Sequence, residues 1–205
     1  MKKIVYAIYL FSITLLVFSF LLTGRSQAVN ETSNVLEVYF SPKGGCMDQV
    51  IYWINKANYS IHILIYSFTL EPVADALVNA SRRGVDVKVV FEKSQINKYS
   101  MYWKLLEAGI PVANDTNSKS MHDKVMVVDD IIVLTGSYNW SNNAEKYNNE
   151  NLVVIKGKWV ADKYEAEFEK IWNQSIVVPE FTVNSALTVL FALTVLGVVL
   201  SKLKR

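Results

Sequence analysis

With 205 residues, the chain supports one medium-sized domain and excludes two large ones, and its single cysteine, Cys46, excludes a disulfide framework. Its formal net charge is +2. Residues 1–28 and 181–205 together hold six of the 21 basic residues and no acidic residue. The middle of the chain, residues 29–180, therefore carries 15 basic and 19 acidic residues. A net charge of −4 in the middle of the chain excludes a uniformly basic nucleic-acid binder, and any polyanion must bind in a local pocket.

The first segment, residues 1–28, predicts a signal peptide or an N-terminal membrane anchor. Lys2 and Lys3 precede an apolar run at residues 4–22, as in an export signal. Small residues at 26–28 form a plausible cleavage site. Because the run is longer than the apolar part of most signals, cleavage and retention as an anchor both stay open.

The middle segment, residues 29–180, alternates predicted strands and helices. Strands are expected at residues 35–40, 60–68, 85–91, 124–128, 131–135 and 152–155. Helices are expected at residues 47–57, 73–80, 102–106 and 160–171. Asp129 and Asp130 are expected to form a turn between two strands. This alternation predicts an α/β fold, an α-β-α sandwich with a central mixed β-sheet, flanked by N- and C-terminal hydrophobic helices.

The last segment predicts a transmembrane helix at residues 181–201, followed by a basic cytoplasmic tail at residues 202–205. About 20 residues with a rise of 1.5 Å each cover the roughly 30 Å hydrocarbon core of a bilayer. Basic flanks stay on the cytoplasmic side. The chain is therefore predicted to lie in the cell membrane, with its middle domain outside the cytoplasm.

Residues 121–151 concentrate the side chains that can act on a phosphodiester. His122 and Lys124 are two residues apart in a predicted strand, so they project from the same face. An ammonium group beside an imidazole makes a poor metal site, because a cation already occupies the position. The pair suits a phosphodiester, since Lys124 can neutralise a phosphate oxygen while the neutral imidazole attacks phosphorus.

The loop after the next predicted strand supplies neutral hydrogen-bond donors. Gly136 allows the backbone to approach a ligand closely, and the side chains of Ser137 and Asn139 can donate to a phosphate. Glu150 can accept from the second nitrogen of the His122 ring, which fixes the tautomer and raises its nucleophilicity. These residues together predict a nucleophile, an orienting carboxylate and a phosphate cradle.

The spacing of these residues resembles the HKD motif of the phospholipase D superfamily. The matching pattern is His122-x-Lys124-x4-Asp129-x6-Gly136-Ser137-x-Asn139. Residues 65–92, 109–112 and 150–151 are similar to the small single-motif branch, which includes a compact bacterial endonuclease and the mitochondrial cardiolipin hydrolase. The likeness covers roughly residues 35–172 and leaves out both hydrophobic ends.

The resemblance implies a role for each matching residue. His122 would be the nucleophile, and Glu150 would orient its ring. Asp129 matches the Asp of the catalytic motif, but its predicted position in a turn between strands favours a structural role. The phosphate ligands would be Lys124, Ser137 and Asn139. No metal and no cofactor are implied.

The family mechanism needs two histidines at one site, one to attack phosphorus and one to protonate the leaving oxygen. His62 does not belong to a second motif, because Leu64 stands where the lysine should be. The second imidazole must therefore come from another copy of the chain. The prediction is a C2 homodimer with one composite active site on its axis, each copy contributing its His122.

Three functions remain open from the sequence. The first is a metal-independent, endonuclease-like phosphodiesterase that works through a phosphohistidine intermediate. The second is a phospholipase D acting on lipid headgroups, favoured because residues 173–180 can span at most about 28 Å and would keep the site near the bilayer. The third is a non-catalytic surface binding module, which the intact His122, Lys124 and Glu150 disfavour.

Overall fold

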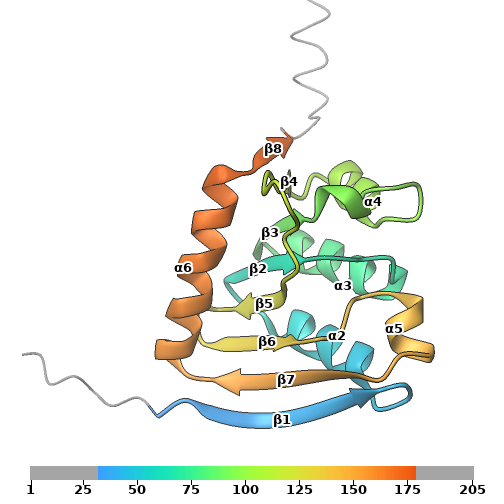
Figure 1. Ribbon diagram of the computed structural model, residues 1–205. Coiled ribbons are helices and arrows are strands. Elements are labelled where there is room, and N and C mark those ends of the chain that lie inside the picture. Colours follow the sequence, from blue (N-terminus) through green and yellow to red (C-terminus); the bar gives the residue numbers. More distant parts are fainter. Residues whose placement is uncertain (1–31, 179–205) are drawn as a thin grey trace, which may run out of the picture. The chain divides into compact units, whose positions relative to one another are not determined.

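The computed structural model describes residues 32–178 (Figure 1). The predicted signal or anchor at residues 1–28, the transmembrane helix at 181–201 and the tail at 202–205 lie outside these residues. Within residues 32–178, no helix is long and apolar enough to cross a membrane.

An eight-stranded sheet in the order β1-β7-β6-β5-β2-β3-β4-β8 runs through the described domain. Its strands are β1 (Asn34–Ser41), β2 (Ser60–Ile65), β3 (Asp86–Phe91), β4 (Val112–Asn114), β5 (Lys124–Val128), β6 (Ile132–Gly136), β7 (Glu150–Lys156) and β8 (Ile176–Val178). Strands β2, β3 and β4 are parallel to one another, and the other neighbours pair antiparallel. The sheet is therefore mixed, as the sequence predicts.

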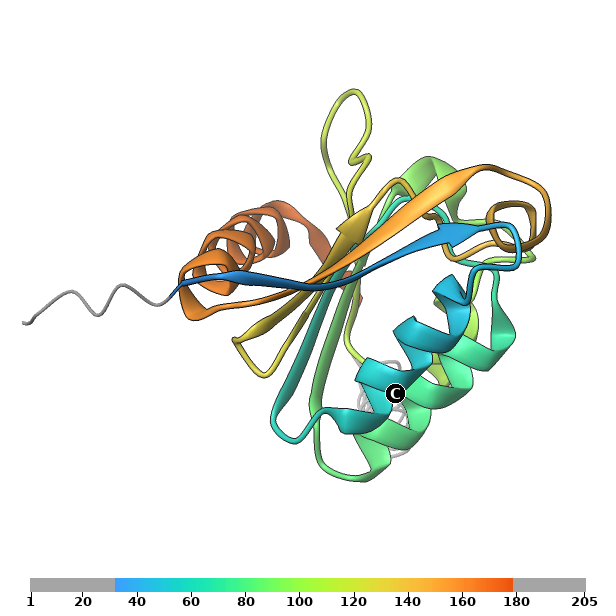
Figure 2. The same cartoon turned by 90° about the horizontal axis from the view of Figure 1, so that it is seen from below.

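Helices cover both faces of the sheet (Figure 2). They are α2 (Cys46–Lys56), α3 (Glu71–Arg82), α4 (Tyr102–Glu107), α5 (Asn142–Lys146) and α6 (Lys158–Gln174), with a short 3-10 turn at Lys93–Gln95. Helix α6 packs on one face, where Phe168 is buried against Leu64 and Val90. The other helices bury their apolar side chains in the larger core on the opposite face. This arrangement confirms the predicted α-β-α sandwich.

The local patterns explain most of these elements. Residues 61–65 of β2 are all buried because helices cover the strand on both sides. Helix α3 buries Val73 and Leu77, and Gly84 with φ +91 lies just beyond its C-cap residue, Arg83. Strand β2 ends at Ile65 rather than at residue 68, because the next residues bond to other segments: the Tyr66 N–H donates to the Asp123 carbonyl, and the Ser67 carbonyl accepts from Trp140.

Candidate active site

All the predicted site residues except Asp129 lie where β5 begins, β6 ends and β7 begins. Lys124 is the first residue of β5 and pairs with Ile65 at the end of β2. Val125 pairs with Thr135 near the end of β6. The chain that enters β5 at His122 and the chain that leaves β6 after Thr135 therefore lie side by side at one edge of the sheet.

His122 and Lys124 contact each other directly. The Lys124 Nζ lies 3.0 Å from the His122 Nδ1 and donates to the His122 backbone carbonyl at 2.7 Å. Because an ammonium group only donates, the Nδ1 atom accepts, and the proton of a neutral ring is then on Nε2. The imidazole itself is exposed, so it is free to meet a substrate or another molecule.

Tyr66 supports this pair, and nothing in the sequence pointed to it beyond the general likeness of residues 65–92. Its ring contacts the His122 ring with a centroid distance of 4.4 Å, and the Lys124 Nζ lies 4.8 Å from its centroid. Its backbone N–H donates to the Asp123 carbonyl at 2.9 Å. Tyr66 therefore positions both the proposed nucleophile and the proposed phosphate ligand.

Lys124 is only 7% exposed, which is unusual for a lysine. Burial lowers the pKa of Lys124 from its ordinary value of 10.5, and the Asp123 and Glu150 carboxylates oppose this only in part. A partly desolvated ammonium group attracts an anion more strongly than a hydrated one does. The side chain is thus suited to binding a phosphate oxygen.

The loop after β6 depends on Gly136. Its φ is +148, and a Cβ atom at this position would lie 2.2 Å from the Asn151 carbonyl oxygen. That same oxygen accepts from the backbone N–H groups of Ser137 and Tyr138. Glycine is therefore required for the loop to pack against the start of β7, which holds the donor residues in place.

The two predicted donors of this loop differ in their surroundings. The Ser137 hydroxyl accepts from the Asn151 backbone N–H at 3.1 Å, so its own proton can point outward to a phosphate. The Asn139 Oδ1 atom is buried and has no hydrogen-bond partner within residues 32–178. An unpaired buried acceptor is uncommon in folded proteins, and a phosphate oxygen, which also accepts, cannot pair with it, so only the amide NH2 group of Asn139 could bind a phosphate.

Glu150 lies at the same edge, as the first residue of β7. In the described part of a single chain it accepts a hydrogen bond from Asn148 at 3.1 Å, and the imidazole of His122 bonds to Lys124 instead. The predicted contact between Glu150 and His122 is therefore not made within one chain. The orienting role of Glu150 stays a prediction.

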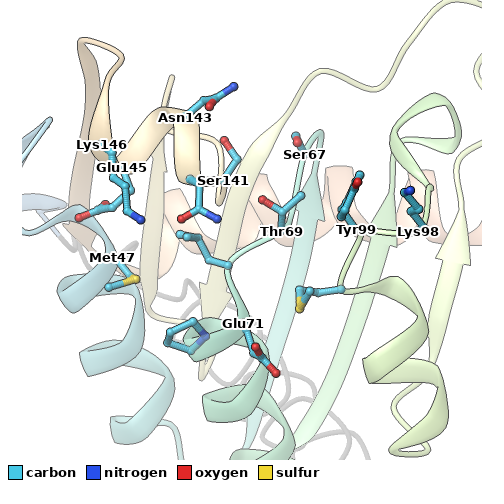
Figure 3. A pocket seen from close by; sticks show the side chains of 14 residues that line it. Met47, Ser67, Thr69, Glu71, Lys98, Tyr99, Ser141, Asn143, Glu145 and Lys146 are labelled. Atoms are coloured by element: carbon cyan, nitrogen blue, oxygen red, sulfur yellow. The ribbon is translucent and has the colours of Figure 1, made fainter.

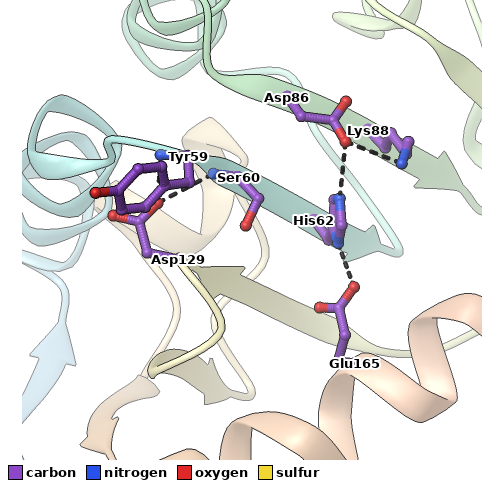
Figure 4. A network of polar contacts seen from close by, with 7 residues as sticks. All are labelled: Tyr59, Ser60, His62, Asp86, Lys88, Asp129 and Glu165. Atoms are coloured by element: carbon purple, nitrogen blue, oxygen red, sulfur yellow. Dashed lines mark hydrogen bonds and ion pairs between the residues drawn. The ribbon is translucent and has the colours of Figure 1, made fainter.

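Asp129 lies at the opposite end of β5 from Lys124, beyond the last residue of the strand. Its carboxylate accepts from the backbone N–H groups of Tyr59 at 2.8 Å, of Ser60 at 3.0 Å and of Asn58 at 2.9 Å (Figure 4). With φ values of 52° and 53°, Asp129 and Asp130 form the expected turn. The geometry places this motif residue in a structural position rather than beside His122.

We expect Asp129→Asn to lower the melting temperature by about 2–8 °C at neutral pH, because it removes charge-assisted hydrogen bonds worth about 1–2 kcal/mol. Burial raises the pKa of Asp129, but the backbone donors outweigh it and bring the net value below 3.8. The carboxylate therefore stabilises the fold above its unfolded pKa, and this contribution is lost as pH falls through the folded value.

Thermal unfolding measured from pH 7 toward acidic pH checks this expectation, with Asp130→Asn as the control in the same turn. A variant as stable as the wild type at pH 7, or one whose deficit grows in acid, would contradict it. Turnover per folded molecule should be unchanged if the role of Asp129 is structural.

Glu92 is a buried carboxylate for which the sequence predicted no role. It accepts from the Met121 backbone N–H at 2.7 Å and from the Ser94 N–H at 3.0 Å. Burial by itself raises the pKa of Glu92, but the hydrogen bonds to Ser94 and Met121 outweigh it and lower the net value. Because Met121 precedes His122, this anion fixes the chain that carries the proposed nucleophile.

His62 is on the other face of the sheet from Lys124. It pairs with Val127 in the ladder between β2 and β5, whereas Ile65 pairs with Lys124, and alternate residues of a strand point to opposite faces. Its ring is buried and bonded to Glu165 of α6. His62 therefore cannot supply the second imidazole of the site within one chain.

A cavity of about 780 Å³ lies beside the donor loop (Figure 3). Its wall includes Ser67, next to Tyr66, and Ser141, two residues after Asn139. Lys98, Tyr99, Glu71, Glu145 and Lys146 also line the cavity. The cavity wall therefore mixes apolar side chains with two lysines and two glutamates, and it includes residues next in sequence to two segments of the site.

The class of the protein follows from this fold and site together with the family match. Residues 50–172 match the family model described as "Cardiolipin synthase, PLD-like domain", and the chain belongs to the phospholipase D superfamily. Both the fold and the family predicted from the sequence are thereby confirmed.

Particular relatives include enzymes named for different substrates. The chain is 35% identical over 126 residues to phospholipase D of Rickettsia prowazekii, covering 61% of this chain and 62% of that protein. It is 32% identical over 120 residues to mitochondrial cardiolipin hydrolase of Xenopus tropicalis, covering 58% and 57%. The chain thus spans less than two thirds of the length of these curated relatives.

One solved structure matches a larger share of this chain than these curated relatives do. The phospholipase D family member Nuc from Salmonella typhimurium is 35% identical in sequence, with a TM-score of 0.67. The match covers 72% of this chain and 99% of that one. The described domain is therefore similar to nearly the whole of that protein.

Proposed function

We propose that this protein is a metal-independent phosphodiesterase that cleaves phosphodiester bonds in nucleic acid through a phosphohistidine intermediate. The observation that carries the proposal is the contact between the exposed His122 imidazole and the buried Lys124 ammonium group, beside the donor loop after β6. Membership of the phospholipase D superfamily supports it.

The proposed reaction has two steps. In the first, the Nε2 atom of one His122 attacks phosphorus, a P–N bond forms and the P–O bond to the leaving group breaks. A second imidazole gives its proton to that leaving oxygen. In the second step, this imidazole takes a proton from water, and the resulting oxygen attacks phosphorus and breaks the P–N bond. Lys124 neutralises charge on the phosphate oxygens throughout.

The second imidazole in this proposal is the partner copy's His122, in a C2 homodimer. The chain has two histidines, and His62 is buried on the opposite face of the sheet, bonded to Glu165. The exposed ring of His122 at the edge of the sheet leaves room for a symmetry-related ring. Lys124 contacts Nδ1 of the ring before substrate arrives. In the attacking copy, Lys124 must release Nδ1 to bind the phosphate, and the proton of the neutral ring must be on Nδ1 so that Nε2 can attack. The ring that protonates the leaving oxygen must start as an imidazolium, so that giving up its Nε2 proton leaves a neutral ring.

The exposed ring of Tyr99 beside the donor loop favours nucleic acid as the substrate. Tyr99 lines the cavity, is 66% exposed and offers a ring on which a base can stack (Figure 3). Lys98 and Lys146 in the same wall can approach neighbouring phosphates, with Glu71 and Glu145 balancing their charge. The curated relatives' names favour the alternative, a phospholipase D that acts on membrane lipid headgroups.

The proposed location is the cell membrane, with the catalytic domain outside the cytoplasm and the helix at residues 181–201 as the tether. This part of the proposal depends on the sequence pattern alone, because residues 179–205 are outside the described part of the chain. A tether of this kind would keep the site near the bilayer whichever phosphodiester it cleaves.

The full chain, purified in a mild detergent and kept in EDTA, should cleave single-stranded DNA or RNA and an aryl phosphodiester. Release of headgroups from phospholipid vesicles without nicking of nucleic acid would favour the lipid alternative. No turnover of any of these substrates would favour a non-catalytic binding module.

The variant Tyr99→Ala makes the test of the substrate class sharper. It should reduce cleavage of single-stranded nucleic acid by roughly tenfold, because base stacking is worth about 1–3 kcal/mol, and should leave turnover of the aryl phosphodiester unchanged. Tyr59→Ala is a matched control, since Tyr59 is also exposed but lies in the loop before β2, at the opposite end of that strand from Tyr66. An equal loss on both substrates would contradict a role in nucleic-acid binding.

A further inference from the structure

A second cluster of ionisable side chains lies on the α6 face of the sheet, outside the site described above. The Nδ1 atom of His62 and one carboxylate oxygen each of Glu165 and Glu169 all lie within 4.8 Å of one another. His62 comes from β2, and the two glutamates are four residues apart on α6, so they share one side of the helix. The cluster joins the last described helix to the middle of the sheet.

The His62 ring is held between carboxylates on both sides (Figure 4). Nδ1 contacts a Glu165 oxygen, and Nε2 lies 3.6 Å from an Asp86 oxygen. The Phe168 ring stacks on the imidazole with a centroid distance of 4.6 Å and an angle of 8° between the planes, which fixes the orientation of the ring. Each ring nitrogen therefore points to a negative group.

A neutral His62 ring leaves one lone pair facing a carboxylate. With the proton on Nδ1 the ring donates to Glu165 and the Nε2 lone pair faces Asp86, and with the proton on Nε2 the Nδ1 lone pair faces Glu165. A second proton on the ring, or a metal ion in place of the Nδ1 proton, removes this conflict. Asp86, Glu165 and Glu169 contribute three negative charges, against the single ammonium group of Lys88, which lies 3.0 Å from Asp86. A divalent cation matches the two remaining negative charges.

Two buried atoms of the cluster are also left without hydrogen bonds. Neither the Glu165 Oε2 nor the His62 Nε2 has a partner at hydrogen-bond distance within residues 32–178. The His62 side chain is 9% exposed, so solvent does not satisfy it. Unpaired buried polar atoms are rare, and here a carboxylate oxygen of the cluster is one of them.

We propose that His62, Glu165 and Glu169 form a binding site for a divalent first-row transition cation such as Zn²⁺, with Asp86 orienting the histidine. One nitrogen and two carboxylate oxygens, with water as a fourth ligand, make a suitable donor set for this class of ion. Ligand atoms around a tetrahedral zinc are about 3.4 Å apart, so the Glu165 carboxylate would draw back from Nδ1 and the Glu169 side chain would rotate toward it when the ion binds. A carboxylate on the second ring nitrogen is the usual partner of a metal-bound histidine.

The role of this site is structural. His62 and Lys124 project from opposite faces of the sheet, so the ion takes no part in the proposed chemistry at His122. It would hold α6 against β2, and only the folded chain brings the three ligands together. Binding therefore stabilises the folded state.

The test uses the full chain in detergent, first stripped with EDTA and then titrated with Zn²⁺ while heat of binding and melting temperature are recorded. We expect a stoichiometry of one Zn²⁺ per chain. The melting temperature should rise by about 5–10 °C when free Zn²⁺ reaches about one hundred times the dissociation constant.

Three variants locate the binding. Glu169→Gln should weaken Zn²⁺ binding more than about tenfold, and Asp86→Asn should weaken it by about 10–100-fold. Glu167→Gln makes the same charge change on α6, and the Glu167 carboxylate pairs with Lys170 instead, so it should bind Zn²⁺ like the wild type. Glu169 has no hydrogen bond or ion pair within residues 32–178, so its substitution should leave the metal-free fold intact.

The absence of any heat or thermal shift with Zn²⁺ would overturn the proposal, and would leave a protonated His62 as the cation between the carboxylates. Equal Zn²⁺ binding by Glu169→Gln and the wild type would overturn it as well. Neither readout depends on catalysis, so failure of the proposed phosphodiesterase activity would not affect the result. Turnover of the aryl phosphodiester well below the melting temperature should be the same with and without Zn²⁺.

Discussion

Replacing His122 with alanine is expected to reduce turnover of an aryl phosphodiester by at least about 10³-fold, because the substitution removes the proposed nucleophile and the proposed proton donor together. The imidazole is exposed, so its loss should change the melting temperature little. Wild-type protein denatured at alkaline pH during turnover should contain a phosphorylated histidine, because the P–N bond is labile in acid and survives in base, and the His122→Ala variant should not. Retention of full activity by this variant would show that the nucleophile is another group.

The same variant tests the composite site when it is mixed with the wild type. In a dimer that needs both copies of His122, a heterodimer of wild type and variant is inactive. Coexpression in equal amounts should therefore leave about one quarter of the wild-type activity, whereas independent sites would leave about one half. Full activity in a species that sediments as a monomer would contradict the dimeric site.

The second large effect is expected from Lys124→Ala, which removes the buried ammonium group beside the imidazole. We expect a loss of about 10²–10³-fold in kcat, as for removal of a group that stabilises charge in a transition state. Lys163→Ala is the matched control, because Lys163 is an exposed lysine of α6 on the other side of the sheet. A loss confined to KM, with kcat unchanged, would mean that Lys124 only helps to bind the substrate.

The pH dependence gives a further readout of Lys124. Burial lowers its pKa from 10.5, so the ammonium group loses its proton at a lower pH than an exposed lysine does. Activity of the wild type should therefore fall as pH rises through this lowered value. The residual activity of Lys124→Ala should lack that alkaline decline, and a profile identical to the wild type would assign the decline to another group.

Several features of this protein could be read from local patterns. The apolar run at residues 60–68 predicted a strand covered on both faces, of which residues 60–65 form β2, and the spacing of Val73 and Leu77 predicted α3. These patterns are readable because burial on one or two faces fixes the period of the apolar residues. The short strands β4 and β8 were not predicted, since three residues each are too few to show a period.

The candidate site was predictable to a similar extent. The spacing from His122 to Asn139 predicted a phosphate site, and the ladder does place those segments together at one edge of the sheet. The parts played by Tyr66 and Glu92 were not predictable, because they reach His122 and Met121 through contacts between distant strands.

The family and the alternation of strands and helices follow from the amino-acid sequence alone, because spaced motifs and apolar periods are properties of short stretches of chain. Which side chains contact one another follows from the folded arrangement. It placed Asp129 against the loop before β2, left Glu150 bonded to Asn148 within one chain, and surrounded His62 with acidic groups from β3 and α6. Such contacts depend on strand order and on the side of the sheet that each helix covers. The contact between His62 and Glu165, about 100 positions apart in the chain, could not be predicted, because the local sequence around each residue does not indicate the strand order.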